Sequence, residues 1–176
     1  MAVDWSSFHV LANTSELVQE GVLSLPPAAR TRPDRLPESY WNKILMMHGQ
    51  DARLVLEKRL RPTDMDSGQG RLSIPRLQIR ANFLSSEEIR TLNNRESITI
   101  PLIEPCLEVR RGLQLKKWNY NNRNFSYVLT KQWNLVAHPF EWNQLREHGL
   151  IQLWSFRENG HLCFCLVNCE APPAAE

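Results

Sequence analysis

The chain has 176 residues, of which 42% are hydrophobic and 23% are charged, and its formal net charge is +2. These values are ordinary for a globular protein, and the length suits one domain with an appendage. No apolar run approaches the roughly 20 residues that a membrane helix needs. The N-terminus carries an acid where a signal peptide carries positive charge. We therefore expect a cytosolic or nuclear protein without a membrane segment.

The charge is distributed unevenly along the chain. Residues 1–52 hold six acids and four bases, and residues 141–176 hold five acids and two bases. By contrast, residues 109–140 hold six bases and no acid, and residues 53–80 hold seven bases against three acids. Two basic segments in a nearly neutral chain indicate a polarised surface that suits a polyanionic partner. A solvated charged face with no partner is the alternative.

The residues that usually carry metal or catalytic chemistry form no pattern typical of a site. In "HLCFCLVNC", His161, Cys163 and Cys165 would point to one face of a predicted strand. Their i,i+2 spacing differs from the Cys-x-x-Cys knuckle of structural zinc. The sequence also lacks a phosphate-binding loop, a Ser/His/Asp or Cys/His arrangement and paired carboxylates in a plausible pocket context. We expect no metal, no cofactor, no small-molecule substrate and no enzymatic activity.

Residues 1–51 read as a helical N-terminal extension with a linker. "TSELVQEGVLSLPP" predicts a short helix that begins at Ser15 and ends before Pro26, and "LPESYWNKILMMHG" predicts a second one. Apolar residues recur at helical spacing in the second helix, at Tyr40, Ile44 and Met47. This stripe predicts a packing face against the domain that follows, and a surface for a protein partner is the alternative.

From residue 52 the pattern changes to short strands at regular spacing. Seven segments are strand-like: "RLVLEKRL", "RLSI", "SITIPLIE", "LEVRRGLQLKKW", "FSYVLTKQW", "LIQLWSFR" and "HLCFCLV". The absence of a βαβ rhythm favours an antiparallel-rich barrel. We expect a mainly β domain over residues 52–168 with short helices, followed by a C-terminal tail over residues 169–176.

Local signals refine this prediction. Gly112 interrupts its strand and predicts a bulge or bend, and "ENG" between the last two strands predicts a hairpin. Ser85 and Glu88 have the spacing of a capping box, which predicts that a helix begins there. A further short helix is expected over residues 134–148.

Two loops between the strands are unusually long and polar. Residues 60–71 separate two strands by more than the two to five residues of a tight hairpin, and basic residues flank them. In the second loop, "NYNNRNF", four of the seven residues are Asn. Asn and Arg side chains can read base edges through paired hydrogen bonds. The alternative is a turn, because Asn tolerates left-handed backbone geometry.

Three separated motifs, "EKRLRPTDMDSGQGRLSIP", "YVLTKQW" and "IQLWSF", resemble in this order the plant-type B3 DNA-binding domain. The "PTDM", "QGRLSIP" and "FLSSEE" segments, with "LPESYWNKILMMHG" ahead of them, are most similar to one plant subfamily of B3 domain-containing proteins. The resemblance covers about residues 52–168. It implies a seven-stranded open β-barrel, called a pseudobarrel, with two loop arms that hold the major groove of DNA. The N-arm is then Arg61 to Arg71, and the C-arm is Trp118 to Phe125.

The resemblance and the side-chain chemistry together assign candidate DNA contacts. The cationic candidates for phosphates are Lys58, Arg59, Arg61, Arg71, Lys116, Lys117 and Lys131. The polar candidates for base edges are Ser67, Gln69, Asn119, Asn121, Asn122 and Arg123. Trp118 and Tyr120 complete the candidate C-arm surface, whereas Asp64 is expected to organise the N-arm and Trp133 to lie in the core.

The expected function is therefore sequence-specific binding of double-stranded DNA by a plant transcription regulator in the nucleus. The N-terminal extension is a candidate site for a protein partner. The alternative is a B3 fold that serves as a protein-interaction module with weak or no specific DNA binding. Both arms are longer than in the better-known B3 branches, so base preferences of those branches cannot be transferred.

Overall fold

A computed structural model describes residues 31–170 of the chain. The predicted helix between Ser15 and Pro26 and the end of the tail lie outside the described residues. One compact unit begins at Pro33 and contains every described helix and strand.

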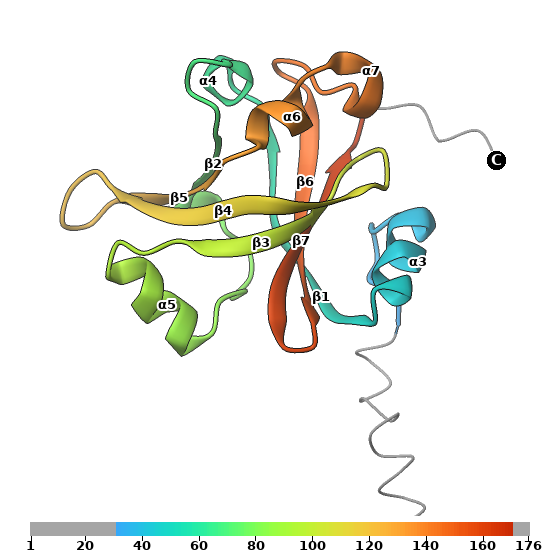
Figure 1. The fold of residues 1–176 in the computed structure, drawn as a ribbon, viewed down its shortest axis with the longest axis horizontal. Coiled ribbons are helices and arrows are strands. Elements are labelled where there is room, and N and C mark those ends of the chain that lie inside the picture. The colour runs from blue at the N-terminus through green and yellow to red at the C-terminus, as the bar shows by residue number, and fades with distance from the viewer. Residues whose placement is uncertain (1–30, 171–176) are drawn as a thin grey trace, which may run out of the picture. The chain divides into compact units, whose positions relative to one another are not determined.

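The core of this unit is one seven-stranded sheet that curls into an open barrel (Figure 1). Its strands are β1 (Gly49–Arg59), β2 (Leu72–Pro75), β3 (Ile98–Ile103), β4 (Val109–Asn119), β5 (Phe125–Thr130), β6 (Leu150–Glu158) and β7 (His161–Asn168). The strand order is β1-β6-β7-β3-β4-β5-β2, and only β3 and β7 pair in parallel. The predicted seven-stranded, antiparallel-rich architecture is confirmed.

The barrel is open between β1 and β2, which end the sheet on either side. These two strands do not pair with each other as strands. Individual hydrogen bonds connect the two sides instead. Lys58 Nζ on β1 donates to the carbonyl of Ser73 on β2 at 2.9 Å, and the Arg80 amide donates to the carbonyl of Val55 at 2.8 Å. The segment between β1 and β2 is therefore a crossing between two sheet edges, which accounts for its length.

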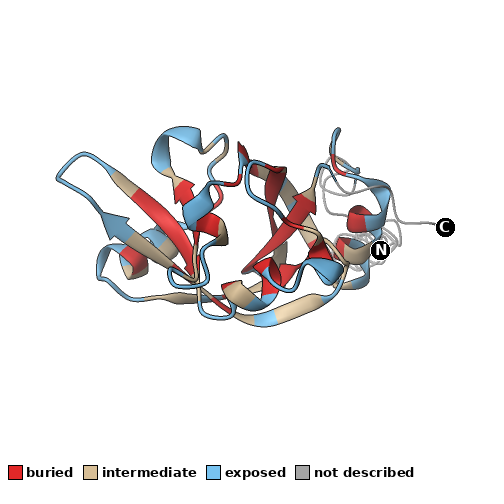
Figure 2. Cartoon of the chain, turned by 90° about the horizontal axis from the view of Figure 1, so that it is seen from above, coloured by how far each residue is buried: buried red, intermediate tan, exposed pale blue. Residues whose placement is uncertain are grey.

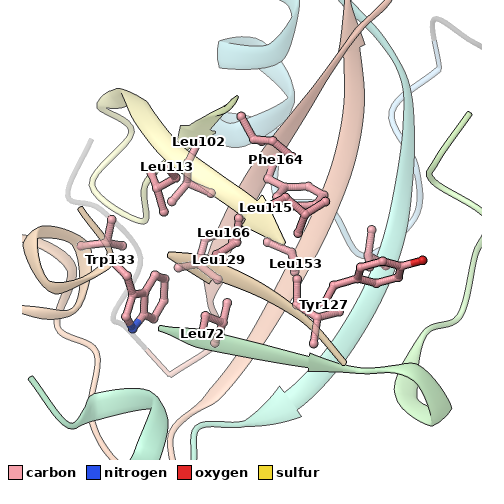
Figure 3. Packing of buried hydrophobic residues seen from close by; sticks show 14 of the residues in the cluster. Leu72, Leu102, Leu113, Leu115, Tyr127, Leu129, Trp133, Leu153, Phe164 and Leu166 are labelled. Atoms are coloured by element: carbon pink, nitrogen blue, oxygen red, sulfur yellow. The ribbon is translucent and has the colours of Figure 1, made fainter. Parts of the chain in front are cut away.

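Both faces of β6 and β7 are buried, and alternate residues enter two different clusters. Leu153, Phe164 and Leu166 point into the barrel interior, which Figure 3 shows. Trp154 and Cys165 point to the opposite face and join the second cluster. The period of two along a strand explains this division. It also explains why these strands read as continuous apolar runs in the sequence.

The second cluster is covered by helix α3 (Glu38–Met46). Tyr40 and Ile44 are buried against the sheet, and Met47 packs at the edge of the same cluster. Tyr40 Oη also donates to the carbonyl of Pro105 at 2.9 Å. The prediction that the apolar stripe of this helix packs against the following domain is confirmed. Helix α3 is thus part of the packed unit, although it precedes the segment that resembles the B3 domain.

The remaining helices are short and lie in the connections. They are α4 (Pro62–Met65), α5 (Ser86–Asn93), α6 (Trp133–Ala137), α7 (Phe140–Asn143) and the 3-10 turn η1 (Arg76–Gln78). Helix α5 begins with the predicted capping box, since Ser85 Oγ accepts from the Glu88 amide and Glu88 Oε1 accepts from the Ser85 amide. The single helix expected over residues 134–148 is wrong. Pro139 separates α6 from α7 because proline lacks an amide donor and disfavours helical geometry in the residue before it.

Two further local predictions are confirmed. The register of β3 against β4 shifts so that Arg111 and Gly112 together face Pro101, which places a bulge at Gly112. Asn159 and Gly160 connect β6 to β7 with φ angles of 51° and 80°. A two-residue loop with both φ angles positive is the favoured turn for a hairpin.

Within residues 31–170, no helix has the length and apolar composition needed to cross a membrane. The same range contains no cluster of three or more His, Cys, Asp or Glu side chains that could hold a metal ion.

Candidate nucleic-acid interface

The N-arm is anchored by a buried ion pair at its base. Lys58 Nζ lies 2.8 Å from Asp64 Oδ2, and the two side chains are 4% and 0% exposed. Asp64 also accepts from the amides of Arg61 and Ser73, at 2.8 and 3.0 Å. One carboxylate therefore binds both ends of the N-arm, and the expectation that Asp64 organises this segment is confirmed.

Helix α6 supports the N-arm from below. Trp133 Nε1 donates to the carbonyl of Asp64 at 2.7 Å, and Asn134 Nδ2 donates to the carbonyl of Ser67 at 2.8 Å. His138 Nε2 lies 2.9 Å from the carbonyl of Met65. Trp133 is buried, as expected, but its indole N–H adds a role that apolar patterning does not reveal. The roles of Asn134 and His138 were not predicted, because no local pattern connects them to a loop about 70 residues away.

The tip of the N-arm is a tight, hydrogen-bonded turn. Asp66 Oδ1 accepts from the amide of Gly68 at 2.8 Å, and the Asp66 carbonyl accepts from the amides of Gln69 and Gly70 at 3.1 Å. Gly70 has a φ of 54°, which favours glycine, and a Cβ there would meet Asn134 Nδ2 at 3.3 Å. The side chains of Ser67 and Gln69 lie exposed on this turn.

The C-arm is the tip of the β4–β5 hairpin, whose last strand pair is Asn119 with Phe125. Asn121 Oδ1 accepts from the amides of Arg123 and Asn124, at 2.9 and 2.8 Å. Asn121 therefore shapes the turn with the oxygen that a base contact would use. Asn119, Asn122 and Arg123 are exposed. Figure 2 shows this tip in pale blue at the left, beyond the buried strands that carry it.

A stacking contact connects the two arms. The Arg71 guanidinium, at the end of the N-arm, lies 4.7 Å from the ring centroid of Trp118, at the start of the C-arm. Arg71 Nη2 also donates to Gln69 Oε1 at 2.8 Å. A second cation, Arg76, lies 5.5 Å from the ring of Phe125 and donates to the carbonyl of Arg123. The N-arm leads into β2 and the C-arm leads into β5, and these two strands pair with each other; Figure 1 shows the segment with α4 at the top and the β4–β5 tip at the far left.

The predicted phosphate contacts divide into engaged and available cations. Lys58 is a correction: it points into the barrel, is 7% exposed as a residue and is paired with Asp64, so its charge does not reach the surface. Burial lowers the pKa of Lys58, and the neighbouring Asp64 carboxylate opposes this shift. Alternation along β1 explains the error, since Lys58 and Arg59 lie on opposite faces.

Two other cations on the predicted surface already have partners. Arg59 Nη1 donates to the carbonyl of His148 and to Glu170 Oε1, both at 2.9 Å. Lys117 Nζ donates to Asn93 Oδ1 at 2.7 Å and lies 4.1 Å from the ring centroid of Phe125. Within residues 31–170, no hydrogen bond or ion pair engages the side-chain nitrogens of Lys116, Lys131 or Arg123. Arg61 is exposed at the start of the N-arm.

Comparison with known proteins identifies the family. Residues 32–170 match the model of the family described as B3 domain-containing protein At2g31720-like. The chain belongs to the B3 domain family. The matched range includes helix α3 as well as the seven strands, in agreement with the packing of that helix on the sheet.

Curated relatives from Arabidopsis thaliana are similar over most of this chain. B3 domain-containing protein At2g32645 is 31% identical over 128 residues, which are 68% of this chain and 67% of that protein. B3 domain-containing protein At1g05920 is 36% identical over 153 residues, which are 77% of this chain but only 46% of that protein. This chain thus spans less than half of the second relative. Among solved structures, the Arabidopsis FUS3-DNA complex matches 65% of this chain and 97% of its own chain, with 15% identity and a TM-score of 0.41.

Proposed function

We propose that this B3 protein binds double-stranded DNA sequence-specifically in the major groove and thereby regulates transcription in the nucleus. Membership of the B3 domain family supports DNA binding. The N-arm (Arg61–Arg71) and the C-arm (Trp118–Phe125) are the proposed contact elements.

The observation that carries the proposal is the contact between Arg71 and Trp118, 4.7 Å from guanidinium to ring centroid. It joins two polar, cationic loops that are about 50 residues apart in the sequence. Arg71 Nη2 donates to Gln69 Oε1, and the remaining N–H groups of the guanidinium can donate to phosphate or guanine acceptors. Hydrogen bonds within and beneath both arms already hold their backbones in place. DNA binding would therefore require less ordering of these loops.

The proposed contacts differ from the set expected from the sequence. Lys58 is left out because it is buried. Arg59 and Lys117 are secondary because their charged groups bind side chains outside the two arms, Glu170 and Asn93. Arg61, Arg71, Lys116 and Lys131 are the proposed phosphate contacts. The proposed base-reading side chains are Ser67, Gln69, Asn119, Asn122 and Arg123, whereas Asn121 is proposed to maintain the turn that presents them.

Selection of bound sequences from a random duplex pool, at a fixed salt concentration, tests the proposal. We expect one enriched motif, bound with a dissociation constant well below the non-specific range of about 10⁻⁴ to 10⁻⁶ M. If no motif is enriched and the affinity stays in that range, the proposal fails and the protein-interaction alternative is favoured.

Variants then separate base reading from phosphate binding. Arg123→Ala or Gln69→Ala is expected to relax the preference at one base position, with a loss of about 1–3 kcal/mol of discrimination. Arg61→Gln is the matched comparison and should weaken all duplexes about equally. A uniform loss of affinity with Arg123→Ala would show that Arg123 does not read bases.

A further inference from the structure

The edge of β4 beside the C-arm is unpaired on one side. Strand β3 begins with Ile98 opposite Leu115, whereas β4 continues to Asn119 and is paired there only with β5. The turn that connects α5 to β3 lies beside this free edge, since Lys117 Nζ donates to Asn93 Oδ1 at the end of α5. The result is a recess between the first residues of the C-arm and the α5–β3 turn.

This recess is a pocket of about 440 Å³ with a cationic and aromatic lining. It is lined by Arg95, Glu96, Lys116, Lys117, Trp118, Asn119 and Tyr120. Three of these residues are basic and one is acidic. Trp118 and Tyr120 are 38% and 58% exposed, and the Arg71 guanidinium lies over the Trp118 ring. Such a lining favours an anion next to a less polar group, as the phosphate and deoxyribose of a nucleic-acid backbone provide.

Arg95 is the one cation in this lining that the sequence did not bring into the candidate interface. It is exposed, and no hydrogen bond or ion pair engages its guanidinium within residues 31–170. Lys116, which lines the same pocket, is equally without such a partner in that range, whereas Lys117 is bound to Asn93. Two cations at one recess therefore have unfilled hydrogen-bonding capacity.

The backbone conformation of Arg95 indicates which substitution can remove its charge without destabilising the turn. Its φ is 64°, and it occupies the position after the C-cap of α5 where a left-handed residue ends the helix. The Arg95 amide donates to the Leu92 carbonyl and the Glu96 amide donates to the Thr91 carbonyl, both at 3.2 Å. This is the Schellman pattern, in which glycine is the usual residue because it has no Cβ. An arginine is less favourable than glycine in this conformation, and within residues 31–170 no hydrogen bond or ion pair of its side chain offsets the cost.

We propose that Arg95 and Lys116 bind a phosphate of the DNA backbone, so that the α5–β3 turn is a third DNA-contacting element beside the N-arm and the C-arm. The inference rests on the proposed function, because it takes the C-arm to lie on a duplex. The contact is to a phosphodiester and carries no base preference.

Three variants test this contact. Arg95→Gln removes the charge, and Arg95→Gly removes it while supplying the residue that the backbone favours. Arg90→Gln is the matched control, since Arg90 is an exposed cation on the same helix that does not line the pocket. Affinity is measured by fluorescence anisotropy, for the selected duplex and for a scrambled one, over a series of salt concentrations.

Both Arg95 variants are expected to lose about two- to fivefold in affinity for the two duplexes alike. The slope of log K against log salt should decrease in magnitude by about 0.9, which corresponds to one phosphate. Arg95→Gly should keep or raise the melting temperature, so the loss cannot be ascribed to misfolding. Arg90→Gln should change affinity and slope less than either.

Several results would overturn the inference. Unchanged affinity and salt slope in both Arg95 variants would show that Arg95 does not contact a phosphate. The proposed function would still stand if Gln69→Ala relaxes the base preference. A loss confined to the selected duplex would also overturn the inference, because a phosphate contact is blind to sequence. If the natural chain fails to bind any duplex above the non-specific range, the proposed function and this inference both fail.

Discussion

Lys58 Nζ on β1 and Asp64 Oδ2 in the N-arm lie 2.8 Å apart in the interior. Both side chains also bind the backbone of Ser73 on β2. The pair connects the two edge strands of the open barrel, β1 and β2, at the point where the N-arm begins. Each charge in such a pair offsets the desolvation cost of the other, so the pair is stable only when both are present. The N-arm is thereby held at both ends by the same carboxylate.

Replacing one member of this pair should destabilise the fold. Lys58→Met is expected to lower the free energy of unfolding by about 3–5 kcal/mol, because Asp64 is left as an unpaired buried charge. Urea denaturation measures the change. Arg59→Met removes the same charge one residue along, from an exposed pair with Glu170, and should cost no more than about 1 kcal/mol. Equal small losses for the two variants would contradict the structural role of Lys58.

The support of the N-arm by α6 predicts an effect on specificity. Asn134→Ala removes the hydrogen bond to the Ser67 carbonyl, worth about 1 kcal/mol, and should leave the tip of the N-arm less ordered. We expect the affinity ratio between the selected and a scrambled duplex to fall about fivefold. Leu135→Ala, at an exposed residue on the same helix, is the control and should leave this ratio unchanged. The idea fails if both variants preserve the ratio.

Helix α3 should contribute to stability as part of the packed unit. Trp41 is 6% exposed and packs in the cluster beneath this helix, so Trp41→Ala should lower the free energy of unfolding by about 3–5 kcal/mol. Met46, on the same helix, is 74% exposed, and Met46→Ala should change the free energy of unfolding by less than about 0.5 kcal/mol. Chemical denaturation of both variants provides the comparison. A helix that merely flanks the domain would give two small effects.

The ion pair between Glu88 and Arg157 predicts a pH dependence of stability. Arg157 donates to both carboxylate oxygens of Glu88, at 2.7 and 3.0 Å, and so ties α5 to β6. Burial opposes ionisation, but hydrogen bonds from Arg157 and the Ser85 amide outweigh it and lower the pKa of Glu88. A carboxyl whose pKa is lower in the folded state stabilises that state above its unfolded pKa. This contribution is lost as the pH falls through the folded value.

The measurement compares the natural chain with Glu88→Gln by urea unfolding between pH 7 and pH 3. The stability advantage of the natural chain should be full at neutral pH and should shrink below the ordinary glutamate pKa of 4.5. Asp51→Asn, which alters an exposed pair with Arg53, is the reference for general charge effects. An advantage that stays constant over this range would show that ionised Glu88 does not contribute through Arg157.

The sequence alone determined the strands, the local turns and the face that α3 buries. Alternation in β6 and β7, the spacing of Ser85 and Glu88 and the Asn159–Gly160 turn depend on near neighbours, so periodicity and turn chemistry were sufficient. Only the tertiary structure decided which cations reach the surface. Lys58 belongs to the same basic segment as Arg61, but the pairing of β1 with β6 turns it inward, where Asp64 meets it. In the same way, Asn134 reaches the N-arm and Arg95 reaches the C-arm only because the barrel brings distant segments together. Such contacts depend on how the sheet curls and closes, which no local pattern in the chain encodes.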